Sequence, residues 1–213
     1  MTFVGVLPTN TRVTMNLRTF SLYLFLFAAI GGSVQARLIT FDDLTDTSLN
    51  GEGTPIKNGY AGLDWDNFNV LNTQSISPPN GFVNGTVSVP NVAYNVGGLE
   101  ASISSLTPID LDKLQMAANN YQNLVAIISA YYQGTLETQR QVTLSTTGAT
   151  FVELNFHNVT SVVFDAGGRE MLLDDVSISF VPEPSHYGFA VFLALAGLVV
   201  WRRLPTLSDV ARQ

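Results

Sequence analysis

Aromatic side chains gather in a glycine-rich, acidic stretch that runs from Asn58 to Phe68. Tyr60 and Trp65 stand near Asn67, whose amide group can both donate and accept hydrogen bonds. Aromatic faces stack on the apolar faces of sugar rings, and amides and carboxylates bind sugar hydroxyls, so the stretch predicts a carbohydrate contact. The alternative interpretation is that Trp65 belongs to a strand that enters the core, since tryptophan is mostly buried.

Acidic residues dominate the central part of the chain. Between Arg37 and Val181 there are fifteen acidic and five basic residues, a net charge of −10, whereas the whole chain carries −7. Such a surface repels nucleic acid, so we expect no nucleic-acid partner, and it suits divalent cations or neutral glycans. The 213-residue chain has no cysteine. Because no disulfide can stabilise the fold, we expect structural calcium, which prefers hard oxygen ligands, as a substitute.

Few residues are suited to catalysis. The chain lacks a cysteine nucleophile and a Gly-x-Ser-x-Gly motif, and its two histidines are His157 and His186. His186 belongs to a terminal segment, which leaves His157 alone for a Ser-His-Asp triad. Paired carboxylates are the one remaining route, through glycoside hydrolysis. We therefore expect a non-catalytic protein, with a glycan-active hydrolase as the alternative.

The elements that must position these residues are β-strands. Apolar or alternating segments recur about every 8–12 residues between turn signals. The expected strands cover residues 38–41, 109–116, 124–132, 136–144, 151–156, 161–164 and 171–180. This pattern predicts an all-β ectodomain, a β-sandwich or jelly roll, over residues 37–180. A helix over 106–121 is the alternative for that segment, because 113–123 is rich in alanine, glutamine and leucine.

Three short motifs carry a resemblance to a known layout. Ile39–Leu44 reads Ile-Thr-Phe-Asp-Asp-Leu, Asn58–Phe68 holds the aromatic stretch, and Leu172–Val176 reads Leu-Leu-Asp-Asp-Val. Together they resemble secreted β-sandwich proteins that are similar to galactose-binding-like jelly rolls. The resemblance implies a fold whose first and last strands lie side by side and can share a calcium ion.

Two acidic pairs fall on those two strands. Asp42 and Asp43 lie on the first expected strand, and Asp174 and Asp175 lie on the last. Like charges on paired strands repel unless a cation bridges them. One carboxylate from each pair, with backbone carbonyls, would supply oxygens to a calcium ion. The alternative is that all four are solvated edge charges that discourage aggregation.

The N-terminal segment has the features of a signal peptide. An 11-residue apolar run covers Phe20–Ile30, and Val34-Gln35-Ala36 fits the small-x-small pattern that precedes a cleavage site. We expect residues 1–36 to form a signal helix that is removed after Ala36. Either Met1 or Met15 can serve as the start.

The C-terminal segment combines a rigid motif, an apolar run and a basic stop. Pro182-Glu183-Pro184 precedes a 15-residue apolar run, residues 187–201, and Arg202-Arg203 follows. The prolines fix an extended hinge. The run would span about 22 Å as a helix, short for a bilayer core of about 30 Å. Arginines at its end favour the cytoplasmic side.

These three parts, in this order, resemble the PEP-CTERM sorting domain of Gram-negative bacteria. The resemblance covers residues 181–205, a short transmembrane helix included, and leaves 206–213 as a tail. It implies recognition by an exosortase, transient or lasting membrane anchorage, and delivery to the polysaccharide-rich cell surface. The alternative is an ordinary single-span membrane anchor.

These features together favour one function. We expect an exported, surface-associated, non-catalytic protein of the extracellular polysaccharide matrix. The first alternative is a lectin-like carbohydrate-binding module centred on Tyr60 and Trp65. The second is the glycan-active hydrolase.

Overall fold

The computed structural model describes residues 36–48, 51–77 and 79–181, together with Leu193 and Gly197. Most of the expected signal peptide, the motif Pro182-Glu183-Pro184 and the pair Arg202-Arg203 lie outside these residues. Ala36, the expected cleavage residue, begins the first strand. Among the described residues no helix is both long and apolar enough to cross a membrane.

Strands make up most of the described chain, which confirms the all-β prediction. They are β1 Ala36–Ile39, β2 Thr54–Pro55, β3 Asp64–Asp66, β4 Phe68–Asn72, β5 Asn91–Asn95, β6 Ala101–Ala118, β7 Leu124–Tyr132, β8 Thr135–Leu144, β9 Thr150–Asp165 and β10 Met171–Phe180. The helices are short: α2 Gly81–Gly85 and the 3-10 turns Tyr60–Gly62, Thr73–Ser75 and Val96–Gly98. The helical alternative for residues 106–121 is wrong, because most of that segment lies in β6.

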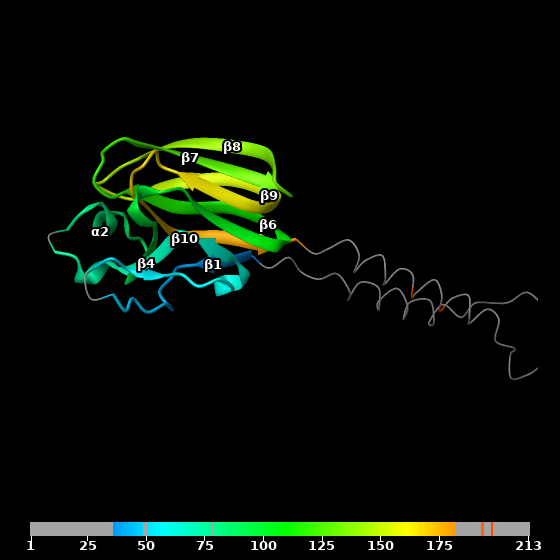
Figure 1. Ribbon diagram of the computed structural model, residues 1–213, viewed down its shortest axis with the longest axis horizontal. Helices are drawn as coiled ribbons and strands as arrows, with labels where there is room; N and C mark the ends of the chain where they lie inside the picture. The colour runs from blue at the N-terminus through cyan, green and yellow to red at the C-terminus, as the bar shows by residue number, and fades with distance from the viewer. Residues whose placement is uncertain (1–35, 49–50, 78, 182–192, 194–196, 198–213) are drawn as a thin grey trace, which may run out of the picture. The chain divides into compact units, whose positions relative to one another are not determined.

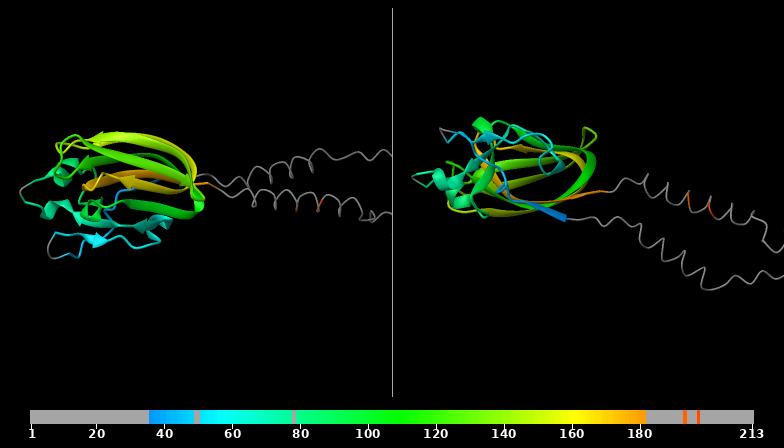
Figure 2. Two further views of the ribbon diagram at one scale, coloured as in Figure 1. Left: turned by 45° about the horizontal axis from the view of Figure 1, so that its top comes forward. Right: turned by 90° about the horizontal axis from the view of Figure 1, so that it is seen from below.

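The strands form a sandwich rather than one flat sheet. They are ordered β2-β4-β5-β10-β6-β9-β7-β8, with β1 added to β10 and β3 added to β6. The long strands β6 and β9 shift register between Ser104 and Ile109, and irregularities of this kind let a strand pass from one sheet to the other. Figures 1 and 2 show the two layers, with β7 and β8 in one and β1 and β4 in the other.

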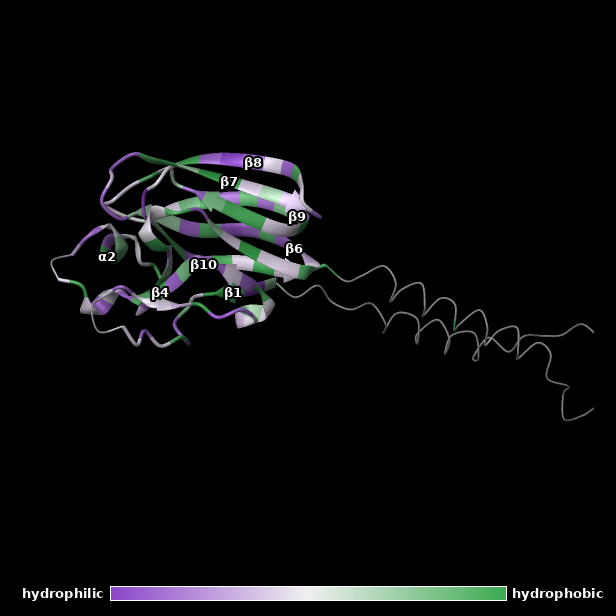
Figure 3. Ribbon diagram, in the orientation of Figure 1, coloured by the Kyte–Doolittle hydropathy of each residue, from purple (hydrophilic) through white to green (hydrophobic). Residues whose placement is uncertain are grey.

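Alternating side chains fill the space between the layers. In β9 the side chains of Val152, Leu154 and Phe156 are buried, whereas Phe151 and Glu153 point to solvent. Figure 3 shows the same alternation of hydrophobic and hydrophilic residues along the long strands. This period of two is what a half-buried strand requires. The edge strand β8 is largely polar and exposed, as the edge of a sheet tolerates.

The first and last strands are antiparallel neighbours, as the resemblance implied. Ala36 pairs with Ser179 and Ile39 pairs with Val176. One detail of the prediction is wrong: β1 ends at Ile39, so Asp42 and Asp43 lie in the turn that follows it. Since Ala36 lies beside Ser179, the described domain begins and ends at one end of the sandwich. The start of β10 lies at the other end, about 30 Å away at 3.3 Å per residue.

Candidate functional site

Trp65, the centre of the predicted sugar contact, lies in the core. It is 5% exposed, and its ring meets the rings of Phe41 and Phe68 edge-on at centroid distances of 5.5 and 5.6 Å. The indole N–H donates to the carbonyl oxygen of Tyr60 at 3.0 Å. A sugar ring therefore cannot stack on this indole. The prediction of a sugar contact at Trp65 is wrong, and its alternative, burial in the core, is confirmed.

The other two residues of that prediction make bonds within the fold. The Tyr60 hydroxyl donates to Asp43 at 2.6 Å. Burial raises the pKa of Tyr60, and the bond to Asp43 raises it further. The amide nitrogen of Asn67 donates to the carbonyls of Val96 and Glu100, which fixes the chain before β6. Neither residue lines the cavities described below.

Three of the four predicted calcium ligands accept hydrogen bonds from different parts of the fold. Asp42 accepts the backbone N–H of Asn91 at 3.1 Å, and Asp43 accepts the hydroxyl of Tyr60. Asp174 is fully buried under the segment that precedes β5, and Asp175 follows it at a positive φ of 48°. Within the described residues no three Asp, Glu or His side chains gather closely enough to hold a metal ion. The shared calcium site, which needs only one carboxylate from each pair, stays a prediction.

A groove opens between the turns that surround the start of β10. Its larger part has a volume of about 1040 Å³, and its smaller part has a volume of about 190 Å³. Gly97, Asn119 and Glu170 line both parts, so the two adjoin. The groove therefore lies at the end of the sandwich opposite Ala36 and Phe180, near α2 (Figure 1).

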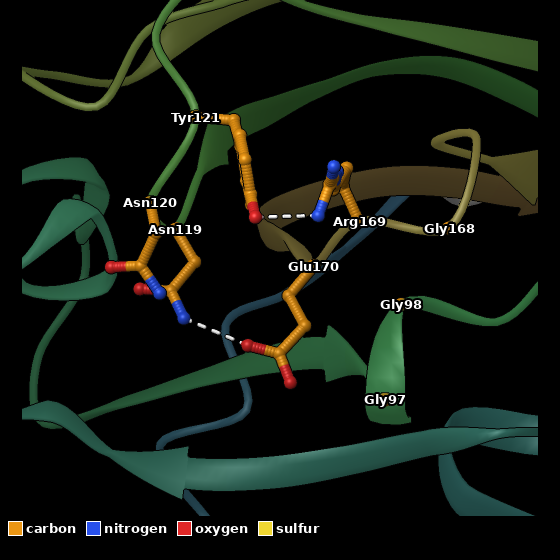
Figure 4. A pocket seen from close by; sticks show the side chains of 8 residues that line it. All are labelled: Gly97, Gly98, Asn119, Asn120, Tyr121, Gly168, Arg169 and Glu170. Carbon is orange, nitrogen blue, oxygen red and sulfur yellow. Dashed lines mark hydrogen bonds between the residues drawn. The ribbon is translucent and has the colours of Figure 1, made fainter.

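Pairing of β6 with β10 brings the central residues of the groove together. Ala118 is opposite Met171, and one residue further the backbone N–H of Asn119 donates to the carbonyl of Glu170 at 3.1 Å. The turn after β6 thus lies beside the turn before β10, although the two are about fifty residues apart in sequence. Figure 4 shows Asn119 and Tyr121 on one side, with Arg169 and Glu170 facing them.

Asn119 carries an acceptor without a partner at this point. Its side-chain nitrogen donates to Glu170 Oε2 at 2.8 Å, which fixes the orientation of the amide because a flipped amide would set oxygen against carboxylate. The residue is 7% exposed, and Oδ1 is buried with no hydrogen-bond partner in the described part of the chain. Such a group costs about 1–3 kcal/mol and calls for an explanation, such as a ligand that supplies a donor.

An aromatic ring stands beside this polar pair. The guanidinium carbon of Arg169 lies 3.8 Å from the centre of the Tyr121 ring, and an Arg169 N–H donates to the Tyr121 hydroxyl. The contact combines a cation–π interaction with a hydrogen bond, so it fixes the ring at the mouth of the smaller cavity. Tyr121 is 46% exposed. Tyr121 thus offers an exposed aromatic surface, which the sequence analysis had expected at Trp65.

The opposite wall is the loop between β1 and β2, which hydrogen bonds hold against β4 and β5. The Tyr94 hydroxyl and the amide nitrogen of Asn69 both donate to the carbonyl of Glu52. Asp46 accepts the backbone N–H of Asn72 at 3.1 Å. Although burial opposes it, this bond and others from Ser48 and Thr54 lower the pKa of Asp46. The wall is therefore held in place by carboxylate and carbonyl oxygens.

Gly81 determines how closely α2 approaches the groove. A Cβ atom at this position would lie 1.9 Å from the carbonyl oxygen of Ala118 and 2.3 Å from that of Asn119. Gly81→Ala is therefore expected to push α2 away, lowering the free energy of unfolding by about 1–3 kcal/mol, as overpacking does. Urea unfolding would measure the loss. Gly148→Ala is the matched control, because its Cβ would meet nothing within 4 Å; equal stability of the two variants would contradict the prediction.

The residues of this groove were not among those predicted from the sequence. Asn119, Tyr121, Arg169 and Glu170 come from the turn sequences Asn-Asn-Tyr and Gly-Gly-Arg-Glu. Turns that combine amides, an aromatic and charges between two apolar strands are a signal for function, since binding residues concentrate in loops. That signal points to several loops of this chain and does not show which of them meet.

No protein-family model and no curated protein matches the chain. Some solved carbohydrate-binding structures are similar in outline. TmCBM61 in complex with beta-1,4-galactotriose is 10% identical with a TM-score of 0.33, over 65% of this chain and 100% of that one. CBM51 from Clostridium perfringens GH95 in complex with methyl-galactose is 9% identical with a TM-score of 0.31, over 67% of this chain and 99% of that one. A CBM4 structure is 12% identical with a TM-score of 0.33, over 62% of this chain and 98% of that one. Likenesses this weak carry no argument about ligand or site, so the proposal below rests on the residues of this chain.

Proposed function

We propose that this protein binds carbohydrate in the groove between Asn119 and Tyr94, without catalysing a reaction. The observation that carries the proposal is the pair of Asn119 and Glu170, in which a buried acceptor without a partner adjoins a carboxylate at the wall of an open groove. Because this oxygen is buried, a sugar hydroxyl or the water that it holds supplies the missing donor once the Asn119 side chain shifts toward the groove.

The rest of the groove has the chemistry that a sugar needs. Tyr121 presents an exposed aromatic surface, and Asn69 and Asn80 add amides to the larger cavity. Leu71 and Phe82 contribute apolar surface. Apolar walls with a few converging polar groups are typical of small-molecule sites. The larger volume leaves room for more than one sugar ring.

The proposed location of the protein follows from its termini. A signal peptide and a PEP-CTERM-like segment would export the chain and deliver it to the surface of a Gram-negative bacterium, by way of an exosortase and the membrane. The groove lies at the end of the domain away from the residues where the described chain begins and ends. A domain tethered by its C-terminus would thus keep the groove free for the extracellular polysaccharide.

Alanine at Asn119 tests the carbohydrate site. We expect Asn119→Ala to weaken oligosaccharide binding at least about tenfold, whereas its stability changes by less than about 1 kcal/mol, since a lost bond to Glu170 is offset by removal of the unsatisfied acceptor. Calorimetric titration of the full-length chain in non-ionic detergent with neutral oligosaccharides measures binding, and urea unfolding measures stability.

Gln141→Ala is the control for that experiment. Gln141 is an exposed amide on β8 and lines neither cavity, so this variant should bind as the parent protein does. Undiminished binding by Asn119→Ala would place the carbohydrate site elsewhere, and absence of binding by the parent protein to every glycan tested would overturn the function.

A hydrolase is the second candidate, because one observation favours it. Glu52 and Glu170 line the same cavity, and glycoside hydrolysis requires two carboxylates in one cleft. The two functions differ in outcome: a hydrolase releases shorter sugars from the bound oligosaccharide, and Glu170→Gln abolishes that release. Intact oligosaccharide after prolonged incubation would exclude the hydrolase.

A further inference from the structure

The charged residues that line the larger part of the groove are all acidic. Of the described residues that line its larger cavity, Glu52 and Glu170 are acidic and none is lysine or arginine. Burial raises the pKa of the Tyr94 hydroxyl, a hydrogen bond with Asn69 lowers it, and the charges of Glu170, Asp46 and Glu52 raise it further. Three carboxylates, two from the β1–β2 connection and one from the β9–β10 turn, therefore act on one point in the wall of the groove.

Two amides and one hydroxyl of the groove already use their donors within the fold. The amide nitrogen of Asn119 is bonded to Glu170, and that of Asn69 is bonded to the carbonyl of Glu52. Asn69 therefore has its carbonyl oxygen left for a ligand, whereas the Asn119 oxygen is buried and that of Asn80 accepts the backbone N–H groups of Phe82 and Val83. The Tyr94 hydroxyl proton is also used, on the carbonyl of Glu52. A ligand that fits such a site brings donors, and a protonated amine has three donors and no acceptor.

Arg169 does not cancel this charge. Its guanidinium lies over the Tyr121 ring and donates to the Tyr121 hydroxyl, within the smaller cavity. The ectodomain as a whole carries −10. A field of this sign repels uronate and sulfate polymers, and it steers cationic polymers towards the protein.

Building on the proposed carbohydrate function, we propose that the ligand of this groove is a cationic amino-sugar polymer, whose ammonium groups lie between Glu170, Glu52 and the carbonyl oxygen of Asn69. Neutral hexoses can donate hydroxyl hydrogen bonds to Glu52 and Glu170, but they bring no positive charge to these carboxylates. A ring that carries an ammonium group gains a charge-assisted hydrogen bond at Glu170. The sugar faces still find Tyr121 at the end of the groove.

Matched oligosaccharides test the ligand class. The full-length chain in non-ionic detergent is titrated, at a mildly acidic pH where the amines are protonated, with β-1,4-linked glucosamine and N-acetylglucosamine oligomers of equal length and with oligogalacturonate. We expect the glucosamine oligomer to bind at least about tenfold more tightly than the acetylated one, and the preference to shrink with added salt. Oligogalacturonate should bind most weakly.

A charge-matched pair of variants assigns the preference to the groove. Glu170→Gln should remove most of the preference for glucosamine while acetylated oligomers still bind. Glu153→Gln removes the same charge from an exposed position on β9 outside both cavities, so it should keep the preference.

The outcomes separate this proposal from the proposed function. Equal or tighter binding of the acetylated oligomer would overturn the amino-sugar ligand and leave the carbohydrate function intact. Absence of binding to any sugar would overturn both. Oligolysine could bind as tightly as the glucosamine oligomer, with this binding lost in Glu170→Gln. That result would show that the groove binds ammonium groups on a peptide and would overturn the sugar ligand.

Discussion

Replacement of Trp65 with alanine is expected to lower the free energy of unfolding by about 3–5 kcal/mol, the usual cost of deleting a buried tryptophan. The indole is 5% exposed and lies between Phe41 and Phe68, with both rings in edge-to-face contact. Its N–H donates to the carbonyl of Tyr60. The variant loses this packing and hydrogen bond together, and it leaves a cavity at the centre of the aromatic cluster.

Urea unfolding measures this loss, and fluorescence shows its cause. The chain has two tryptophans, Trp65 and Trp201, so a Trp201→Phe background leaves Trp65 as the sole reporter. Its emission should be that of a buried indole, and saturating oligosaccharide should not quench it. Phe151→Ala is the control, because Phe151 is 55% exposed and its loss should cost less than about 1 kcal/mol. Emission typical of an exposed indole, or quenching by sugar, would contradict the burial of Trp65.

The periodic part of the fold was predictable because strand patterns are local. Residues 124–132 and 171–180 were expected as strands and are β7 and β10 with those bounds. Residues 151–156 and 161–164 were expected as two strands and form the single strand β9. The polar pair at 157–158 resembles a turn, but it lies where β9 shifts register against β6, and sequence alone does not distinguish a bulge from a turn.

The strands of the middle segment were harder to predict, because asparagines stand where apolar residues are expected. In β5, Asn91 and Asn95 are buried. Asn95 accepts the backbone N–H of Met171 at 2.7 Å and donates to the carbonyls of Leu99 and Arg169. A buried asparagine that bonds to neighbouring backbone looks like a turn residue in the sequence. Only the fold shows that it fixes the Arg169 turn beside the groove.

The candidate site depends on a pairing that no local pattern reveals. Asn119 and Glu170 are neighbours because Ala118 is opposite Met171, and this register between β6 and β10 depends on the whole sandwich. The sequence instead drew attention to Trp65 and Asp174, both of which carry chemistry-bearing groups that the fold buries. The residue types predicted which chemical groups a sugar site needs. Strand pairing determines which residues that carry such groups lie close together.

A loss of about 4 kcal/mol in the free energy of unfolding is expected when Asp174 is replaced with alanine. The side chain is fully buried and accepts the backbone N–H groups of Val87 and Ser88 at 2.8 and 2.9 Å, the Ser88 hydroxyl at 2.7 Å and the N–H of Asp175 at 2.8 Å. These bonds hold the segment before β5 against β10. Alanine leaves the N–H groups of Val87 and Ser88 without this acceptor, at about 1–3 kcal/mol each.

The same carboxyl group makes stability depend on pH. Burial raises the pKa of Asp174 from 3.8 to about 6, although bonds from Ser88 and Val87 lower it, and the charge of Asp175 adds to the rise. Between these two pH values the folded protein keeps a proton that the unfolded chain has released. Stability from this group is therefore fully present below pH 3.8 and is lost as the pH rises to about 6. A shift of about two pKa units corresponds to about 3 kcal/mol.

The hydrogen bonds around Asp174 fit both protonation states. The hydroxyl of Ser88 lies 2.7 Å from Asp174 and 3.3 Å from the carbonyl oxygen of Thr40. When Asp174 is ionised, Ser88 donates to the carboxylate. When Asp174 is protonated, the acid proton can go to the Ser88 oxygen while Ser88 donates to Thr40. The protonated form therefore keeps a hydrogen-bond partner at each carboxyl oxygen, which is consistent with the raised pKa.

Unfolding in urea across this pH range tests the assignment. The parent protein should lose stability from about pH 4 to pH 7 through Asp174, whereas Asp174→Asn, which cannot ionise, should show a flatter profile at a lower stability. Asp175→Asn is the matched control, because Asp175 is the neighbouring carboxylate and asparagine tolerates its positive φ of 48°. This control should keep most of the slope of the parent protein, because the charge of Asp175 is the smallest of the causes that shift the pKa of Asp174. An unchanged slope in Asp174→Asn would assign the titration to another carboxyl group, because the buried carboxyl is the one group that this substitution removes.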